Sequence, residues 1–231
     1  MVFERTGGGA AVHVRLPFAD RAEAGRVLGE LLMPHGLSDP LVLALPRGGV
    51  PVAAEVAGRL GGPDRPAAMD VLVTRKIGYP LQPELGVGAV AEGGEPVFDR
   101  SLLERLGLTE ADLADTVARE RAELARRVHV YRGGRPLSDP AGRAVVVVDD
   151  GLATGVTARA ALRAVRARGP ARLLLAAPVG APDSVRALAG EADEVVVCAQ
   201  PTAFRAVGQW YRRFEQLTDR DVIRLLEGER R

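Results

Sequence analysis

The division of the apolar residues into short runs constrains the fold of this chain most. Five runs consist almost entirely of apolar, β-forming residues without polar alternation, at 41–45, 69–74, 143–148, 172–177 and 194–198. Strands without alternation are covered on both faces, which is typical of a parallel sheet. The runs therefore predict five buried strands.

Helical periodicity fills most of the gaps between these runs. Asp20 and Glu23 have the spacing of a capping box and precede an apolar face. Apolar positions at helical intervals recur within 52–60, 160–165 and 185–189. Alternation of strand and helix predicts an α/β fold, doubly wound, with a mainly five-stranded parallel sheet.

Two segments depart from this alternation. The stretch between the second and third runs is too long for a simple crossover, so we expect a helical insertion at about 79–136. It holds a glycine-rich stretch, a short strand at 96–98, and a long helix after a Thr109–Asp112 cap. Four of the nine aromatic residues lie in the last segment, which predicts a small C-terminal hood at about 199–231.

With a core at about 15–198, we expect residues 1–231 to form a single domain. The 31 basic residues balance 30 acidic ones, which argues against a nucleic-acid partner. No stretch approaches the ~18 apolar residues of a membrane span, so we expect no membrane partner and a cytoplasmic location. The lone Cys198 and three scattered histidines suggest neither a disulfide nor a zinc site.

The basic residues are divided unevenly, because Lys76 is the only lysine among 31 lysines and arginines. A lysine kept in a chain that otherwise uses arginine suggests a site that needs an ammonium group. A lysine on a solvated face is the alternative interpretation.

The strongest chemical signal is the segment 145–157, which reads VVVVDDGLATGVT. A buried strand brings Asp149 and Asp150 to its C-terminal end, where ligands bind in α/β sheets. Backbone N–H groups and hydroxyls around 154–157, at the start of a helix, can cradle a phosphate. Adjacent carboxylates suit sugar hydroxyls or Mg²⁺-bound water, whereas helix capping would use only one of them.

This segment resembles the thirteen-residue signature of the type I phosphoribosyltransferases: four apolar residues, two acids, three variable residues, Thr-Gly and a small hydroxyl residue. The resemblance implies the fold of that family and a site for 5-phosphoribosyl-1-pyrophosphate (PRPP). It implies catalytic roles for Asp149 and Asp150 on the ribose hydroxyls, with Mg²⁺ held near them mainly through substrate and water. The implied 5-phosphate site consists of Gly151, Ala153, Thr154, Gly155 and Thr157.

Two further loops agree with this resemblance, which implies that both contact pyrophosphate. The loop after the first run contains Arg47, Gly48 and Gly49, although a strand–Gly-Gly–helix turn is also a common structural element. The loop after the second run contains Arg75 and Lys76, so the sole lysine is expected where a strand end faces the anion.

The resemblance also extends to the mobile loop and the hood of the family. The stretch 83–94 matches, in position, a mobile loop that closes over the reacting sugar. Within it, Glu84 is a candidate for proton transfer or a solvated loop acid. The aromatic residues Phe204, Trp210 and Tyr211 resemble a hood that stacks on a base, although a hydrophobic clasp explains them nearly as well.

The sequence does not identify the base that would accept the phosphoribosyl group. Hypoxanthine-type members have an aspartate where this chain has Ala153, and a lysine where it has the lysine-free stretch 176–178. Over about 15–225, the chain is most similar to bacterial phosphoribosyltransferases of unassigned substrate. We expect transfer of a phosphoribosyl group to a nitrogenous, purine-like base. The alternative is a non-catalytic regulatory protein that senses PRPP. Small molecules are the expected partners, and a homodimer is compatible with the sequence.

Overall fold

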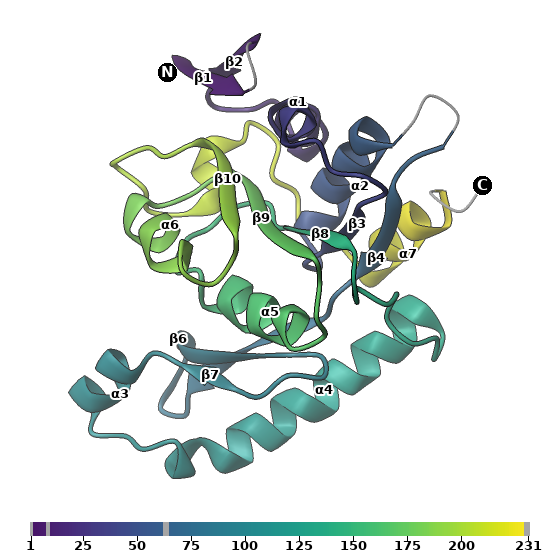
Figure 1. The fold of residues 1–231 in the computed structure, drawn as a ribbon. Coiled ribbons are helices and arrows are strands. Elements are labelled where there is room, and N and C mark those ends of the chain that lie inside the picture. The colour runs from purple at the N-terminus through teal and green to yellow at the C-terminus, as the bar shows by residue number, and fades with distance from the viewer. Residues whose placement is uncertain (1, 8–9, 62–64, 229–231) are drawn as a thin grey trace.

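The computed structural model describes residues 2–7, 10–61 and 65–228 (Figure 1). Its centre is a five-stranded, entirely parallel sheet with the strand order β10-β9-β8-β3-β4. This confirms the predicted α/β class and sheet. The strands are β3 (Leu41–Ala44), β4 (Ala68–Val71), β8 (Ala144–Val148), β9 (Arg172–Val179) and β10 (Glu194–Ala199).

Helices cover both faces of this sheet, which explains why its strands lack polar alternation. Val42 and Val146 face α1 (Arg21–Leu32) and α2 (Gly49–Leu60), whereas Leu43 and Val147 face α5 (Val156–Arg166) and α6 (Pro182–Leu188). All four of these strand side chains are fully buried. The result is the doubly wound arrangement that the sequence predicts.

The insertion forms a second sheet, and the expected mobile loop is mostly strand. β5 (Thr74–Tyr79) and β6 (Gln82–Ala91) make an antiparallel hairpin, to which β7 (Val97–Phe98) adds a third strand. The predicted strand at 69–74 is therefore divided between two sheets, and the second sheet starts at Thr74 rather than at 79.

The glycines of β6 have a packing explanation. A Cβ atom on Gly86 would lie 2.6 Å from Cδ of Lys76, and one on Gly88 would lie 2.7 Å from the carbonyl oxygen of Val97. Glycine at these positions allows neighbouring strands and side chains to approach closely. The expectation of a loop is therefore corrected to a strand over Gln82–Ala91, where glycine allows close packing, whereas closure over the sugar stays a prediction.

Two helices complete the insertion: α3 (Arg100–Leu106), which the sequence did not predict, and α4 (Ala114–Arg132), which it did. The predicted cap is present, since Oδ2 of Asp112 accepts from the Thr109 hydroxyl at 2.7 Å. A short 3-10 turn, η2 (Ala111–Leu113), separates this cap from α4. The predicted surface pair on α4, Glu123 with Arg127, is confirmed at 2.8 Å.

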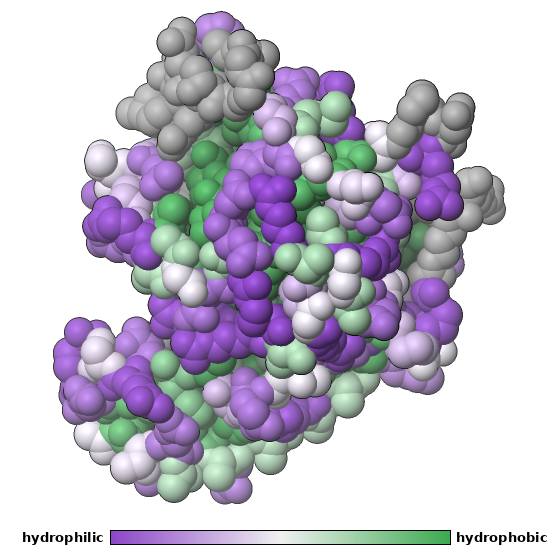
Figure 2. Space-filling model, viewed as in Figure 1, coloured by the Kyte–Doolittle hydropathy of each residue, from purple (hydrophilic) through white to green (hydrophobic). Residues whose placement is uncertain are grey.

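Helix α5 lies between the two sheets (Figure 1). Its side chains Ala161 and Leu162 pack against the central sheet. Ala160 and Ala164 pack against β6 and β7. Figure 2 shows the insertion as a lower lobe, set off from the core by an indentation on one side. The insertion thus rests on a helix of the core.

The remaining elements lie toward the two ends of the chain. β1 (Val2–Gly7) and β2 (Ala10–Arg15) form an antiparallel hairpin that the sequence did not predict, and η1 (Met33–His35) follows α1. After β10 come η3 (Val207–Trp210) and α7 (Asp219–Gly228), the latter packed against α2 and α4. Among the described helices, none combines the length and the hydropathy that a membrane crossing needs.

Candidate active site

The acid pair lies directly after β8, at the carboxyl edge of the central sheet. The N–H of Asp149 donates to the carbonyl oxygen of Ala176 on β9 at 3.2 Å. Oδ1 of Asp149 accepts the N–H of Asp150 at 2.8 Å. Both residues are half-buried. The backbone of Asp149 and its carboxyl are therefore held by neighbouring backbone groups before any ligand binds.

Burial dominates the electrostatics of this pair. Burial, followed by the charge of Asp150, holds the pKa of Asp149 well above its usual range. Burial also raises the pKa of Asp150, but a nearby guanidinium opposes that shift. Nε of Arg21 donates to Oδ2 of Asp150 at 2.8 Å. Two adjacent buried acids with one direct cation partner favour further cations or hydroxyl donors at this point.

The glycine loop before α2 meets the acid pair. A Cβ atom on Gly48 would lie 1.9 Å from Oδ2 of Asp150, and one on Gly49 would lie 2.6 Å from the carbonyl oxygen of Val148. The peptide bond between Pro46 and Arg47 is cis. The structure thus brings the predicted loop of the first strand into direct contact with the predicted acids.

The N-terminus of α5 provides an uncapped set of N–H groups. Gly155 precedes the helix with φ +71°, where a side chain would also meet Cδ1 of Leu188 at 2.8 Å. No side chain caps this end, and N–H groups in the first turn of a helix have no intrahelical acceptor. Thr154 is exposed and Thr157 half-buried, while Gly151 is buried against Val207. This arrangement suits an anion.

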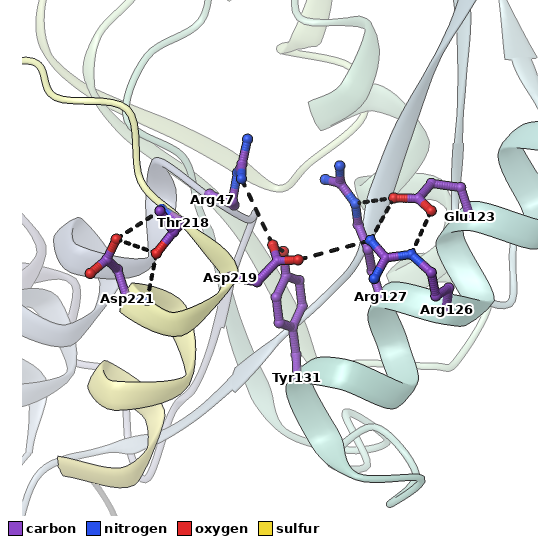
Figure 3. Close-up of polar contacts among 8 residues, drawn as sticks. All are labelled: Arg47, Glu123, Arg126, Arg127, Tyr131, Thr218, Asp219 and Asp221. Carbon is purple, nitrogen blue, oxygen red and sulfur yellow. Dashed lines mark hydrogen bonds and ion pairs between the residues drawn. The ribbon is translucent and has the colours of Figure 1, made fainter.

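Arg47 lies in a cluster that joins three elements (Figure 3). Its Nη1 is 3.9 Å from Oδ1 of Asp219, at the start of α7. The same oxygen accepts the Tyr131 hydroxyl at 2.6 Å, and Nη2 of Arg126 lies 3.8 Å from Oδ2. Burial, then the bond to Asp219, raises the pKa of Tyr131, so its hydroxyl stays protonated. Nothing in the sequence singled out Asp219.

The second predicted pyrophosphate loop is part of a strand. Arg75 and Lys76 belong to β5, so the expectation of a loop after a strand end was wrong. Nε of Arg75 donates to Glu120 of α4 at 2.7 Å, whereas Lys76 is exposed. Both line a pocket of about 620 Å³ between β5 and α4. Glu84 is exposed on β6. None of the contacts described for these residues joins them to the acid pair.

The predicted aromatic residues fall into two groups. The rings of Phe204 and Trp210 lie 6.0 Å apart. Tyr211 is only 6% exposed, packs against Phe18 and Phe214, and donates its hydroxyl to the carbonyl oxygen of Asp150 at 2.6 Å. Tyr211 therefore supports the acid loop, and its ring has little free surface for stacking.

Arg21 contacts Asp150 directly, and no pattern in the sequence indicated it. Every lysine or arginine of the chain except Lys76 is an arginine, so neither composition nor spacing could single it out. Its position one residue after the Asp20 cap places it at the start of α1, but that signal gives no direction for the side chain.

The acid pair between a glycine loop and the uncapped N-terminus of α5, on a doubly wound sheet, is the arrangement of a phosphoribosyl-transferase type of domain. The family model of the phosphoribosyl transferase domain matches residues 21–209, and the chain belongs to this family. The provisionally named phosphoribosyl transferase Rv0571c of Mycobacterium tuberculosis (strain ATCC 25618 / H37Rv) is 45% identical over 210 residues. That match covers 91% of this chain and 46% of the relative, so the chain spans about half the length of the curated relatives it matches.

A solved structure is similar over nearly its full length. The crystal structure of TT1426 from Thermus thermophilus has 45% sequence identity and a TM-score of 0.75. The match covers 91% of this chain and 98% of that one. This likeness supports the α/β architecture, including the insertion.

The acid pair also fits a magnesium ion of the expected kind. Within residues 2–7, 10–61 and 65–228, no group of three or more metal-ligating side chains occurs. Mg²⁺ usually keeps several waters and is bound by one or two carboxylates together with substrate phosphates. Asp149 and Asp150 supply two carboxylates, so substrate and water would supply the remaining ligands.

Proposed function

We propose that this chain transfers the 5-phosphoribosyl group from PRPP to a nitrogenous base and releases pyrophosphate, a reaction of nucleotide metabolism. One observation carries the proposal. The acid pair after β8 contacts Gly48 and Gly49 at the start of α2, and leads into the uncapped N-terminus of α5. A sugar that carries a phosphate at one end and a diphosphate at the other matches this order of groups.

Each part of the donor has a candidate partner. The N–H groups of the α5 first turn, with Thr154 and Thr157, would bind the 5-phosphate. Asp149 and Asp150 would accept hydrogen bonds from the ribose hydroxyls. Arg47, with the backbone of the glycine loop, would bind the diphosphate. A magnesium ion near the acid pair would reduce the negative charge of the departing diphosphate.

The reaction needs no covalent intermediate on the protein. A ring nitrogen of the base forms a bond to C1 of the ribose, the C1–O bond to the diphosphate breaks, and its electron pair leaves with pyrophosphate. A proton on the attacking nitrogen passes to solvent or to an exposed acid such as Glu84. The protein contributes orientation and charge stabilisation, which account for large rate effects in reactions of this type.

Pyrophosphate release tests the proposal. The purified chain is mixed with PRPP, Mg²⁺ and a panel of purine and pyrimidine bases. We expect release with at least one purine-like base, and a fall of about 100-fold or more in Asp150→Asn, which removes an ionised group from the site. Asp183→Asn is the matched control, because Asp183 is exposed on α6 and pairs with Arg186 of the same helix.

Calorimetric binding of PRPP separates the alternatives. Binding without release from any base, weakened by Asp150→Asn, would favour the non-catalytic PRPP-sensing function. Absence of both binding and release would contradict both functions.

The acceptor is proposed to stack on the Phe204–Trp210 pair. Replacement of Phe204 by Leu should raise KM for the base while leaving the affinity for PRPP unchanged. A parallel change in both quantities would place this pair outside the acceptor site.

A further inference from the structure

Arg21, the first residue of α1, has a buried ion pair with the acid loop. Nε donates to Oδ2 of Asp150 at 2.8 Å, and the two side chains are 11% and 14% exposed. Other described ion pairs of α1 differ, since Arg26 pairs with Glu55 at 3.2 Å with 48% of its side chain exposed. Partners at low exposure hold one another more firmly than partners in water.

The other groups of the Arg21 guanidinium are also engaged. Nη1 donates to the carbonyl oxygen of Glu215 at 3.0 Å. The central carbon (Cζ) of the Arg21 guanidinium lies 3.9 Å from the centroid of the Phe214 ring. A planar guanidinium that is held at two nitrogens and on one face has a fixed orientation. Arg21 therefore presents Nε to Asp150 in one direction.

The backbone beside Arg21 is tied to the C-terminal segment 210–215. The N–H of Phe18 donates to Trp210 at 2.8 Å, and the N–H of Arg212 donates back to Phe18 at 2.8 Å. From the same segment, the hydroxyl of Tyr211 reaches the carbonyl oxygen of Asp150. The start of α1 and the hood are thus bonded to each other. Together they hold Asp150, at its carboxylate through Arg21 and at its backbone through Tyr211.

The orientation of this carboxylate matters for the glycine loop before α2. Oδ2 of Asp150 lies in the space that a Cβ on Gly48 would fill, at 1.9 Å. A rotated carboxylate would either leave the glycine loop or press against it. The group that holds Oδ2 therefore controls how the acid pair and the diphosphate loop fit together.

We propose that Arg21 is a positioning residue for the transfer reaction. It fixes the Asp150 carboxylate at the ribose site and couples it to the segment 211–215 of the hood. This inference rests on the proposed function. Arg21 acts through Asp150 and does not touch the reacting atoms.

Steady-state kinetics of Arg21→Ala, Arg21→Lys and Arg26→Ala test the role. In Arg21→Ala we expect KM for PRPP to rise about tenfold and kcat to fall about tenfold, because a misplaced group costs rate as well as affinity. Arg21→Lys should recover part of the KM, since an ammonium can pair with Asp150 but cannot also donate to Glu215 in a fixed plane. Arg26→Ala should match the unchanged chain.

A double-variant cycle measures PRPP affinity in a way that separates positioning from a structural role. The pattern expected below would not arise if Arg21 only stabilised the fold. Adding Arg21→Ala to Asp150→Asn should cause no further loss of PRPP affinity, because the group through which Arg21 acts is already altered. If Arg21→Ala does not fold, Arg21→Lys and Phe214→Leu carry the test. Phe214→Leu keeps the ion pair but removes the ring, and should give a smaller change in the same direction.

The outcomes are separable. Normal kinetics in Arg21→Ala, or independent losses in the double variant, would overturn the inference while leaving the proposed function standing. If the unchanged chain binds PRPP without turnover, the same variants are compared by calorimetric Kd with the same expectations. If it neither binds PRPP nor releases pyrophosphate, the proposed function fails and this inference fails with it.

Discussion

The carboxyl edge of the central sheet and the insertion hold their charged residues in different ways. At the sheet edge, Asp150 is fixed by a buried strand, a glycine loop and Arg21. In the insertion, Arg75 pairs with Glu120 while Lys76 is exposed. The first arrangement is set by backbone packing together with a well-shielded ion pair, before a ligand arrives. The second depends on side-chain pairs near the surface, which a competing anion can replace.

The buried side chain of Arg132, at the end of α4, ties the insertion to the central sheet, and removing it should have the largest effect on stability. Arg132 is 3% exposed and donates to the carboxylate of Glu92 and to the carbonyl oxygen of Val71 at 2.8 Å. Arg132→Met leaves Glu92 unpaired, and we expect a loss of about 3–5 kcal/mol in the free energy of unfolding, measured in urea.

Arg166→Met is the control for that variant. Arg166 pairs with Asp193 at 2.7 Å, but both side chains are more than two-fifths exposed, at 44% and 42%. Its loss should be below about 1 kcal/mol. Equal losses in the two variants would show that the link between core and insertion contributes no more than a surface pair.

Gly48→Ala should have the next largest effect, on donor binding. The new methyl group would overlap Oδ2 of Asp150 and force the glycine loop and the acid apart. We expect PRPP affinity to fall about 100-fold, measured by calorimetry. Gly58→Ala on the same helix meets nothing within 4 Å, and should stabilise the chain by about 0.5–1 kcal/mol without changing affinity. Unchanged affinity in Gly48→Ala would remove the glycine loop from the site.

The raised pKa of Asp149 predicts a pH dependence of intermediate size. The pKa of Asp149 in the folded chain lies above its ordinary value of 3.8, so the folded chain holds the carboxyl proton more tightly than the unfolded chain does. The protonated Asp149 carboxyl therefore adds to the free energy of unfolding. This contribution is fully present below the ordinary pKa and is lost as the pH rises through the pKa of the folded chain. Asp149→Asn should abolish this dependence.

Binding of PRPP with Mg²⁺ needs the ionised carboxyl, so affinity should fall as the pH decreases through the same range. Because one proton is involved, the affinity should fall by at most about tenfold per pH unit. Calorimetry in two buffers of different ionisation enthalpy should detect proton release on binding. Binding without proton release across this range would contradict the expected role of the carboxyl.

The smallest effect is expected for Lys76→Ala. Lys76 is exposed, so its loss should leave the unfolding midpoint unchanged. If it contacts the donor diphosphate, PRPP affinity in Mg²⁺ should fall by up to about tenfold, and Lys76→Arg should recover only part of it, because the site is expected to need an ammonium group. Unchanged affinity in Lys76→Ala would leave the sole lysine as a surface residue.

The sequence predicted the core well because burial on both faces leaves a plain pattern in each strand. The runs around Val42 and Val146 could be recognised without knowledge of their neighbours. The acid pair was recognisable for a related reason, since a strand end and a glycine-containing turn fix its place within a few residues.

The insertion was harder to predict because its glycines have two physical meanings. Gly86 and Gly88 allow close approach within a sheet, yet the same residues in the sequence are also typical of a loop. The contact of Arg21 with Asp150 joins positions 129 residues apart, and no local pattern encodes it. Long-range pairs of this kind are visible only once the chain is folded.

Helix α5 has a consequence for how the chain opens. Ala160 and Ala164 face one sheet while Leu162 faces the other, so α5 cannot leave one layer without exposing part of the second. Amide hydrogens of α5 should therefore exchange only in the rarest opening events, together with those of β8 and β9. The proposed phosphate site at its N-terminus is thus attached to a part of the molecule that we expect to exchange slowly, although the N–H groups of its first turn have no side-chain cap.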